Sequence, residues 1–256
     1  MIILAVGDIV GSPGTDFFCE RIGGLRRLFG ADMVVANAEN SAYSGVGVNR
    51  STATALFRAG ADVLTTGNHA FRSRDYREVF EENALLLRPA NYAAGIAGRV
   101  AAVCDLGRYR VGVINLSGQS FMESCDNYYD ALDRALAEMD TRLILVDFHA
   151  EATAEKLALA HYADGRVSAL FGTHTHVQTA DEQVLPQGTG YITDLGMTGP
   201  ADAVLGIRPE CSIQKQRFKL PTVFEVAGGD CRLCGALFDI DEATGRCRSV
   251  ERVAVR

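Results

Sequence analysis

Residues 1–14 read MIILAVGDIVGSPG, an apolar strand pattern that passes directly into the start of a helix. Ile2–Val6 is short and rich in β-branched residues, which is typical of a strand buried on both faces. Ser12 and Pro13 then predict a helix start, with Ser12 as the N-cap and Pro13 at the first helical position. We expect this helix to reach Phe29 and to end at Gly30. A strand followed at once by a helix is the repeating unit of α/β proteins.

The same alternation recurs along the rest of the chain. It predicts further strands at Met33–Ala36, Val63–Thr66, Leu143–Phe148, Val167–Phe171 and Tyr191–Thr193. It predicts further helices over residues 49–59 (closed by Gly60), 73–82 (capped by Ser73), 126–139 and 151–162. Strands separated by helices pair in parallel through right-handed crossovers. The fold class predicted from this pattern is α/β.

Two regions interrupt the parallel pattern. Residues 99–105 and 110–116 flank Gly107-Arg108, which predicts a hairpin. The last third turns antiparallel, with expected strands at 222–226, 232–240 and 246–255. No linker, repeat or low-complexity tract divides the chain, so we expect a single domain over residues 1–256, with two sheets or one large mixed sheet.

Composition excludes several classes of protein. The chain has 25 Lys and Arg residues against 32 Asp and Glu residues, a net charge of −7, which argues against a general nucleic-acid coat or a binder of anionic membranes. Its seven cysteines are odd in number and scattered, so a disulfide framework is not expected. No signal peptide or stretch of about 18 apolar residues is present. We therefore expect a cytoplasmic protein without a membrane partner; the sequence leaves a homo-oligomer open.

Polar residues that can bind metal follow the predicted strands one after another. They are Asp8 after the first strand, Asn37, Glu39 and Asn40 after the second, Asn68 and His69 after the third, His149 after Leu143–Phe148, and His174 and His176 after Val167–Phe171. Sites in open α/β sheets form at the carboxyl ends of the strands. Each residue alone has an ordinary explanation as a cap, a turn residue or a core histidine. Their recurrence at equivalent positions predicts a metal site.

The residue types indicate which metal chemistry this site would support. Four of the chain's five histidines lie at these strand ends, and we expect His174 and His176 to point to the same side of an extended segment. The fifth, His161, is expected on a helix away from these loops, as a surface or packing residue. A set of His, Asn, Asp and Glu without thiolate suits a catalytic divalent ion of the Mn, Fe or Zn kind. The set is too large for one tetrahedral ion, so we expect two ions.

Competing motifs are weaker. The chain has no Gly-Lys dipeptide for a phosphate loop and no Gly-x-Ser-x-Gly elbow. His149-Ala150-Glu151 matches the first half of a zinc-deaminase signature, and Cys231 and Cys234 offer a second half. Asp230 stands where that signature has proline, and the gap is very long. We instead expect both cysteines to pack in a strand pair.

Several longer blocks resemble one known family. They are residues 7–14, Asn37-Ala38-Glu39-Asn40, Thr66-Gly67-Asn68-His69, residues 87–92, residues 146–153, residues 172–181 and residues 192–200. Together they resemble the calcineurin-like metallophosphoesterases, and more narrowly a small bacterial family of 2′,3′-cyclic-nucleotide 2′-phosphodiesterases. The resemblance extends from the N-terminus to about residue 208.

The resemblance implies a layered α/β/β/α sandwich with mixed sheets and a two-metal site. Asp8, Asn40 and His176 would hold one ion, Asn68, His149 and His174 would hold the other, and Glu39 would bridge them. His69 would be the proton donor. Two positions depart from the pattern: Val10 stands where the wider superfamily has a ligand histidine, and Phe71 stands where the narrower family has tryptophan, which bears on substrate stacking.

These implications lead to an expected activity. The protein would hydrolyse small cyclic nucleotides, most of all 2′,3′-cyclic nucleoside monophosphates, through attack by a metal-generated hydroxide. The ions would be Fe or Mn, with Zn or Mg as alternatives. Asp147 and Glu151 are candidates to orient His149. The ordinary alternative for Asp147 is an outward-facing strand residue, and that for Glu151 is a carboxylate at the start of a helix. Arg88 and Arg208 are weak candidates for substrate contacts, and residues 194–208 are expected to form a loop beside the site.

Two other functions remain open at this point. One is a nucleotide-responsive regulatory protein that acts by binding and hydrolyses slowly. The other is a phosphatase or nuclease of broad specificity that uses the same metals, although the acidic net charge disfavours long nucleic acid as a substrate. A complete set of ligands together with a proton donor favours catalysis over binding alone.

Overall fold

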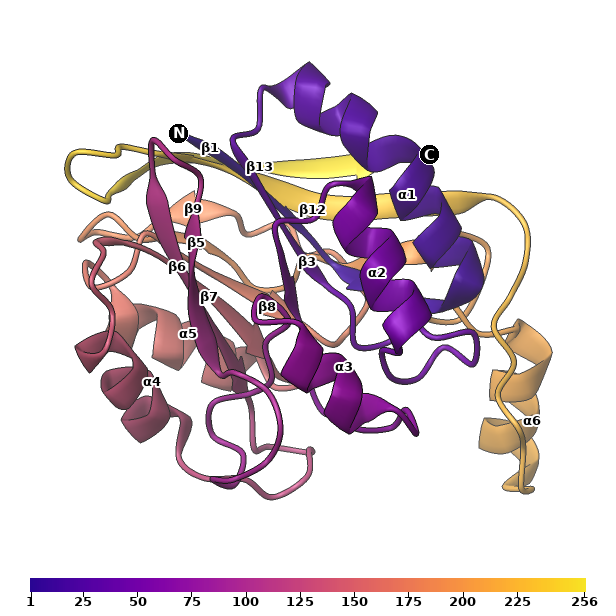
Figure 1. Cartoon of the computed structure of the whole chain (residues 1–256). Coiled ribbons are helices and arrows are strands. Elements are labelled where there is room, and N and C mark those ends of the chain that lie inside the picture. The colour runs from indigo at the N-terminus through magenta and orange to yellow at the C-terminus, as the bar shows by residue number, and fades with distance from the viewer.

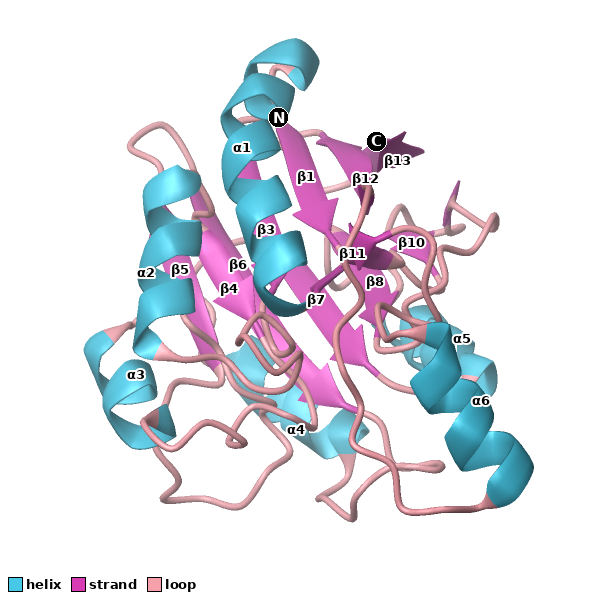
Figure 2. Ribbon diagram, turned by 90° about the vertical axis from the view of Figure 1, so that its right-hand side faces the viewer, coloured by secondary structure: helices cyan, strands magenta, loops and turns pink.

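The computed structural model describes residues 1–256 and has four layers, α/β/β/α (Figure 1). Two sheets lie face to face. Helices α1 (Gly11–Phe29), α2 (Arg50–Ala59) and α3 (Tyr76–Glu82) cover the first sheet, and α4 (Tyr128–Ala137) and α5 (Thr153–Ala163) cover the second (Figure 2). The predicted α/β class, the layered sandwich and its mixed sheets are confirmed.

The first sheet combines parallel and antiparallel strands. Its order is β2-β11-β12-β1-β3-β4, and β13 pairs with β12. The strands are β1 (Ile2–Val6), β2 (Asp8–Ile9), β3 (Met33–Asn37), β4 (Val63–Thr65), β11 (Met197–Pro200), β12 (Cys231–Ile240) and β13 (Cys247–Val255). β1, β3 and β4 are parallel, whereas β12 runs antiparallel to β1, β11 and β13.

The second sheet has the order β5-β6-β7-β8-β10-β9. Its strands are β5 (Ala101–Asp105), β6 (Arg110–Ser117), β7 (Leu143–His149), β8 (Ala169–Thr173), β9 (Gln183–Val184) and β10 (Gly190–Ile192). β5 and β6 form the predicted antiparallel hairpin, and β6, β7, β8 and β10 are parallel. The loops that follow the parallel strands therefore lie at the carboxyl edges of both sheets.

Alternation along the strands separates three cores. In β1, Ile3 and Ala5 pack between the two sheets, while Leu4 and Val6 pack under the helices of the first sheet. Successive side chains of a strand point to opposite faces, so a strand covered on both sides is apolar throughout. This is why the strands of this chain read as continuous apolar runs.

Helix ends follow the predicted signals with two exceptions. Gly30 adopts the left-handed conformation (φ 62°) that ends α1, and Asn49 forms a capping box that starts α2. Ser12 is not an N-cap, because α1 begins two residues earlier than predicted, at Gly11, with Val10 in the N-cap position. Ser73 does not cap α3 either, since the N-cap is Asp75 and the Ser73 hydroxyl donates to its carboxylate.

The segment between β11 and β12 differs most from the prediction. Residues 194–208 are not wholly a loop, since Met197–Pro200 forms the buried strand β11. Helix α6 (Pro209–Phe218), which the sequence pattern does not indicate, stands apart from the other helices (Figure 1). Residues 222–225 form no strand, because this segment lies at the surface, where Phe224 is half-exposed. No helix has the length and apolar composition needed to cross a bilayer.

Candidate metal centre

The structure brings the predicted strand-end residues together between the carboxyl edges of the two sheets. Asp8 follows β1, Glu39 and Asn40 follow β3, Asn68 and His69 follow β4, His149 ends β7, and His174 and His176 follow β8. Part of this set lines a pocket of about 470 Å³, here called the metal pocket. Its polar lining residues are Glu39, Asn40, Ser44, His69, Glu151, His174, Thr175 and His176.

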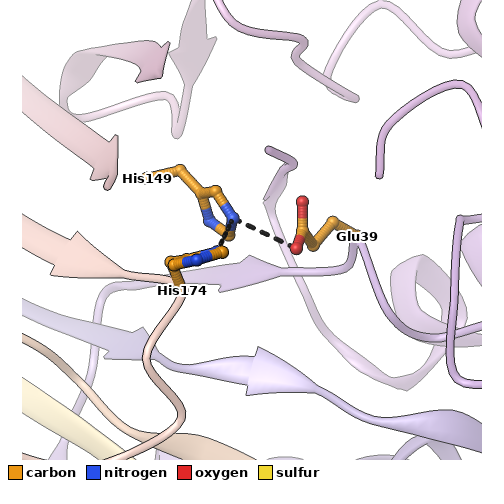
Figure 3. Close-up of side chains that lie close together, drawn as sticks. All are labelled: Glu39, His149 and His174. Atoms are coloured by element: carbon orange, nitrogen blue, oxygen red, sulfur yellow. Dashed lines mark hydrogen bonds and ion pairs between the residues drawn. The ribbon is translucent and has the colours of Figure 1, made fainter. Parts of the chain in front are cut away.

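Four ligand atoms converge at the end of β7. His149 Nε2 lies 3.0 Å from Asn68 Oδ1, 3.1 Å from His174 Nδ1 and 3.1 Å from Glu39 Oε1. Figure 3 shows Glu39, His149 and His174 directed toward one another. Ligand atoms that each lie about 2.1 Å from one ion are about 3 Å apart when their bonds to it are close to perpendicular. The cluster therefore has the spacing of a cation site.

Close packing of the backbone makes this convergence possible. A Cβ atom at Gly67 would overlap the imidazole ring of His149, so only glycine fits beside the ring. The next residue, Asn68, then reaches His149 Nε2 with its side-chain oxygen. Glycine at this position thus serves the close approach of the β4 loop to the end of β7.

Buried acceptors set the tautomer of His149. Its Nδ1 lies 2.9 Å from Thr173 Oγ1, and that hydroxyl donates its single proton to Asp147 Oδ1 at 2.7 Å. The hydroxyl must therefore accept from the Nδ1–H of His149. Nε2 consequently carries a free lone pair, which points at the other ligand atoms.

The two histidines after β8 are held in the same way. His174 Nε2 lies 3.2 Å from Glu151 Oε2, so Nδ1 carries the lone pair that faces His149 Nε2. His176 Nδ1 donates to the carbonyl oxygen of Leu205 at 3.0 Å, so Nε2 carries its lone pair. Two imidazole lone pairs that face each other at 3.1 Å repel unless a cation lies between them. The donor set thus fits a divalent cation.

The other predicted set, Asp8, Asn40 and His176, is more open. His176 Nε2 lies 3.7 Å from Asp8 Oδ1, a buried carboxylate oxygen that has no hydrogen-bond partner. Asn40 directs Nδ2 toward His176 Nε2 at 3.2 Å and its Oδ1 toward His69 Nδ1 at 2.8 Å. An amide nitrogen is no metal ligand, so Asn40 would bind a cation here only after its amide rotates by about 180°. The orphaned Asp8 oxygen supports a cation at this end of the pocket.

The pKa values of the clustered groups show that buried carboxylates and histidines stabilise one another's charged forms. Burial raises the pKa of Asp8 to about 6, despite the nearby histidines. Burial would also raise the pKa of Glu39, but His149 and His69 lower it to about 2. Conversely, burial would lower the pKa of His149, whereas Glu39 and Asp8 raise it to about 9.

His69 lies beside the ligand cluster. Its backbone N–H donates to Glu39 Oε2 at 3.1 Å, and its Nδ1 lies 2.8 Å from Asn40 Oδ1. Burial lowers its pKa, an effect that Glu39 partly offsets. In the amide orientation of this structure, Asn40 Oδ1 accepts from His69 Nδ1. If the Asn40 amide rotates to bind a cation, Nδ2 faces His69 Nδ1 instead, and the ring proton then lies on Nε2. In both orientations Nε2 is the nitrogen left to exchange a proton with a bound molecule.

The loop that carries His174 and His176 is a tight bend. The two residues have φ angles of 101° and 63°, so the expectation of an extended segment is wrong. The bend sends the two rings to opposite ends of the cluster, His174 to His149 and His176 to Asp8. Backbone hydrogen bonds hold this strained conformation, from His174 N to Asp8 Oδ2 and from Thr175 N to Asp194 Oδ2, both at 3.1 Å.

A fully buried ion pair supports the bend from behind. Lys156 Nζ of α5 donates to Asp194 Oδ2 at 2.8 Å, and both side chains are 0% exposed. Asp194 Oδ1 also accepts from the backbone N–H of Gly196 at 2.8 Å. A Cβ at Gly172 would overlap the backbone oxygen of Thr193 and would also lie 2.8 Å from the Lys156 side chain, so glycine allows both to approach.

The supporting roles predicted for Asp147, Glu151 and Phe71 have different outcomes. Asp147 is fully buried and reaches His149 through Thr173, which agrees with its predicted role in orienting His149 and not with an outward-facing position. Glu151 contacts His174 and not His149. Phe71 packs against Tyr76, Phe80 and Tyr92, so it serves the core under α3 and does not line the metal pocket.

The candidate arginines and cysteines lie outside the metal pocket. Arg88 is buried and donates to backbone carbonyls, and Arg208 pairs with Glu225. Cys231 and Cys234 lie in β12 between β11 and β13, as expected, and no cysteine belongs to the metal-ligand cluster, which removes the deaminase alternative. His161 is exposed on α5, as predicted.

Three supporting residues have no role in the sequence predictions. Thr173 and Asp194 lie within the longer blocks without an assigned function, and Lys156 belongs to no motif. Thr173 directly precedes the ligand His174, Asp194 follows the buried strand β10, and Lys156 lies in the buried face of α5, where a polar residue is expensive to bury. The signal that could have identified Lys156 is its position among the buried residues Leu159, Ala160 and Ala163 of α5.

The fold and the cluster together define the class of protein. A four-layer sandwich of mixed sheets, with histidine, asparagine and carboxylate ligand atoms at the ends of its parallel strands, is the architecture of the metallophosphoesterase-type proteins. More narrowly, the chain belongs to the YmdB-like protein family, whose profile matches residues 4–253.

Individual relatives agree over the full length. The chain is 41% identical to the Bacillus subtilis protein named 2′,3′-cyclic-nucleotide 2′-phosphodiesterase, over 100% of this chain and 97% of the relative. A crystal structure of a hypothetical protein from Thermus thermophilus matches with a TM-score of 0.94 and 35% identity, covering 100% of this chain and 99% of that one. A Mycoplasma pneumoniae structure described as a novel phosphatase matches with a TM-score of 0.93 and 32% identity, covering 100% and 93%.

Proposed function

We propose that this protein is a cytoplasmic two-metal phosphodiesterase that hydrolyses small cyclic nucleotides, with 2′,3′-cyclic nucleoside monophosphates as its preferred substrates. A single observation carries the metal dependence: the inward lone pairs of His149 and His174 face each other at 3.1 Å, with Asn68 and Glu39 oxygens close by. The names of the Bacillus and Mycoplasma relatives support phosphoester hydrolysis.

The proposed ligands divide into two groups around Glu39. Asn68, His149 and His174 would hold one ion, Asp8, Asn40 and His176 would hold the other, and Glu39 would bridge them. Iron or manganese suits this nitrogen and oxygen set best, and zinc or magnesium is the alternative. Two bound ions supply a water of lowered pKa and positive charge beside the phosphoryl oxygens.

The chain's own residues complete the reaction. A water oxygen forms the new bond to phosphorus, and the bond from phosphorus to the ring oxygen of the cyclic phosphate breaks. His69, fixed by Glu39 and Asn40, gives a proton to the departing sugar oxygen. Thr173 and Asp147 keep His149 in the tautomer that binds metal.

The charge of the metal pocket favours a diester over a monoester. No lysine or arginine lines the pocket, and Glu151 contributes a carboxylate. A phosphodiester carries one negative charge, whereas a phosphomonoester carries about 1.5 to 2 at neutral pH. The pocket lacks the cationic side chains that would offset the second charge.

Metal analysis together with a substrate panel tests the proposal. Protein purified without chelator should contain two divalent ions per chain and hydrolyse 2′,3′-cyclic AMP faster than nucleoside monophosphates. Chelation should abolish turnover, and added Mn²⁺ or Fe²⁺ should restore it. Hydrolysis that survives complete metal removal would refute the assignment.

A variant of the supporting threonine tests the ligand set independently of turnover. Thr173→Val removes the acceptor at His149 Nδ1 and should weaken metal binding about 10- to 100-fold. Thr198→Val is the matched control, because the buried Thr198 hydroxyl has no hydrogen-bond partner. Equal metal affinity in the two variants would contradict the role of the Asp147–Thr173–His149 chain.

A further inference from the structure

The metal pocket has apolar residues in its lining as well as the candidate ligands. Val46, Leu205, Ile207 and Phe224 line it and are here called the apolar wall. Phe224 is 50% exposed, Leu205 47% and Val46 38%, although all three are large apolar residues. The wall adjoins His176, whose Nδ1 donates to the Leu205 carbonyl oxygen.

A second pocket continues from this wall. It has a volume of about 530 Å³ and shares Ser44 and Phe224 with the metal pocket. Its further lining includes Pro13 and Tyr43, the latter 83% exposed. Phe224 therefore lines two neighbouring cavities, one with candidate metal ligands and one without any of them.

Phe224 has no evident packing role that would explain its position. It lies in a segment without strand pairing, and neither it nor Tyr43 stacks on another aromatic ring of the chain. Phe71, by contrast, packs against three aromatic neighbours. A half-exposed, unstacked aromatic ring in the lining of a pocket is free to stack on a bound molecule.

We propose that Phe224, together with Val46 and Leu205, forms a subsite on which the nucleobase of the substrate stacks while its phosphate lies at the ligand cluster. This inference rests on the proposed phosphodiesterase function and adds to it the residues that recognise the base. The continuity of the apolar wall with the metal pocket carries the assignment, because base and phosphate belong to one small molecule.

The subsite has few free polar groups that could hydrogen-bond to the edge of a base. The Ser44 hydroxyl already donates to the Val46 carbonyl, and Glu225 is paired with Arg208. Stacking accepts every base, because each has an aromatic face. We therefore expect KM values for the four 2′,3′-cyclic nucleotides within about tenfold of one another, with the purines lowest.

The experiment compares Phe224→Ala with wild type on two cyclic phosphates, one with a base and one without. These are 2′,3′-cyclic AMP and glycerol 1,2-cyclic phosphate. The variant should raise KM for 2′,3′-cyclic AMP about 5- to 150-fold, the range that corresponds to one base–aromatic stack of about 1–3 kcal/mol. KM for glycerol cyclic phosphate and kcat for both substrates should change less than about twofold. Phe218→Ala, at a similarly exposed ring of α6 outside both pockets, is the matched control.

A binding measurement keeps the two proposals separate. Calorimetry should show weaker binding of adenosine 3′-monophosphate to Phe224→Ala than to wild type, with unchanged binding of inorganic phosphate. Equal effects on both ligands, or on both substrates, would overturn the base subsite. Failure of the wild-type protein to hydrolyse either cyclic phosphate would instead overturn the proposed function, while the calorimetry still tests the subsite.

Discussion

Replacing Lys156 by methionine should lower both the stability of the fold and the affinity of the metal centre. The substitution keeps the length of the side chain that passes Gly172 but removes the ammonium group from Asp194. The Asp194 carboxylate then stays buried with only the N–H groups of Thr175 and Gly196 as partners. An unpaired buried charge is far more costly than an unpaired charge in water.

The magnitude follows from the burial of the pair. Lys156 and Asp194 are both 0% exposed, so solvent does not screen their interaction. Removing one partner of such a pair costs about 3–5 kcal/mol. In a chain of this size, each kcal/mol lowers the melting temperature by about 2–4 °C, so we expect a decrease of about 6–20 °C.

Asp194→Asn should disturb the histidine bend more directly. Both oxygens of Asp194 accept backbone N–H groups, so an amide in this place must set its NH₂ group against a donor. We expect metal affinity to fall about 10- to 100-fold, because the bend that directs His174 and His176 loses its support. The double variant should be less destabilised than the sum of the two single variants, since it leaves no unpaired charge.

Thermal unfolding and metal titration of the three variants measure these effects. Lys215→Met, at an exposed lysine of α6, is the control and should change the melting temperature by less than about 2 °C. A change as small as this in Lys156→Met would show that the pair contributes little. Strict additivity of the two single variants would show that the two groups do not interact.

Two further variants test the proposed chemistry. His69→Ala should keep both metals and lose about 10²- to 10⁴-fold in turnover of cyclic nucleotides, but far less with the acidic leaving group p-nitrophenol; an emptied metal site would make His69 a ligand. Glu39→Gln should lose more metal and more activity than Asn40→Ala at equal added Mn²⁺, because Glu39 would contribute negative charge to both ions, whereas Asn40 would be a neutral ligand to one. Full two-metal occupancy with near wild-type activity in Glu39→Gln would mean that another group bridges the ions.

Much of the architecture could be predicted from the order of residues. The apolar runs of β1, β3 and β7 are local patterns that a buried parallel strand requires, and Gly30 and Asn49 act within one helix turn of their positions. The antiparallel β12 and β13 follow from alternation and turn residues in the same way. Helix α6 is not predicted, because it makes few contacts with the rest of the chain and therefore lacks the apolar stripe that identifies a packed helix in a sequence.

The ligand candidates could also be found in the sequence, because parallel strands place their carboxyl ends at one edge of the sheet. The sequence could not show which of these candidate ligands contact one another in the folded chain. The positive φ angles of His174 and His176, which send their rings to opposite ends of the cluster, depend on hydrogen bonds to Asp8 and Asp194. These partners lie 166 and 19 residues away along the chain.

What the sequence determined by itself is therefore most of the strands, most of the helices and the identity of the candidate ligands. Only the tertiary structure decided which buried groups support them. Asp147 reaches His149 through Thr173, and Lys156 reaches the histidine bend through Asp194. A hydrogen bond depends on atoms within about 3 Å, and no spacing along the chain specifies which distant side chains come that close.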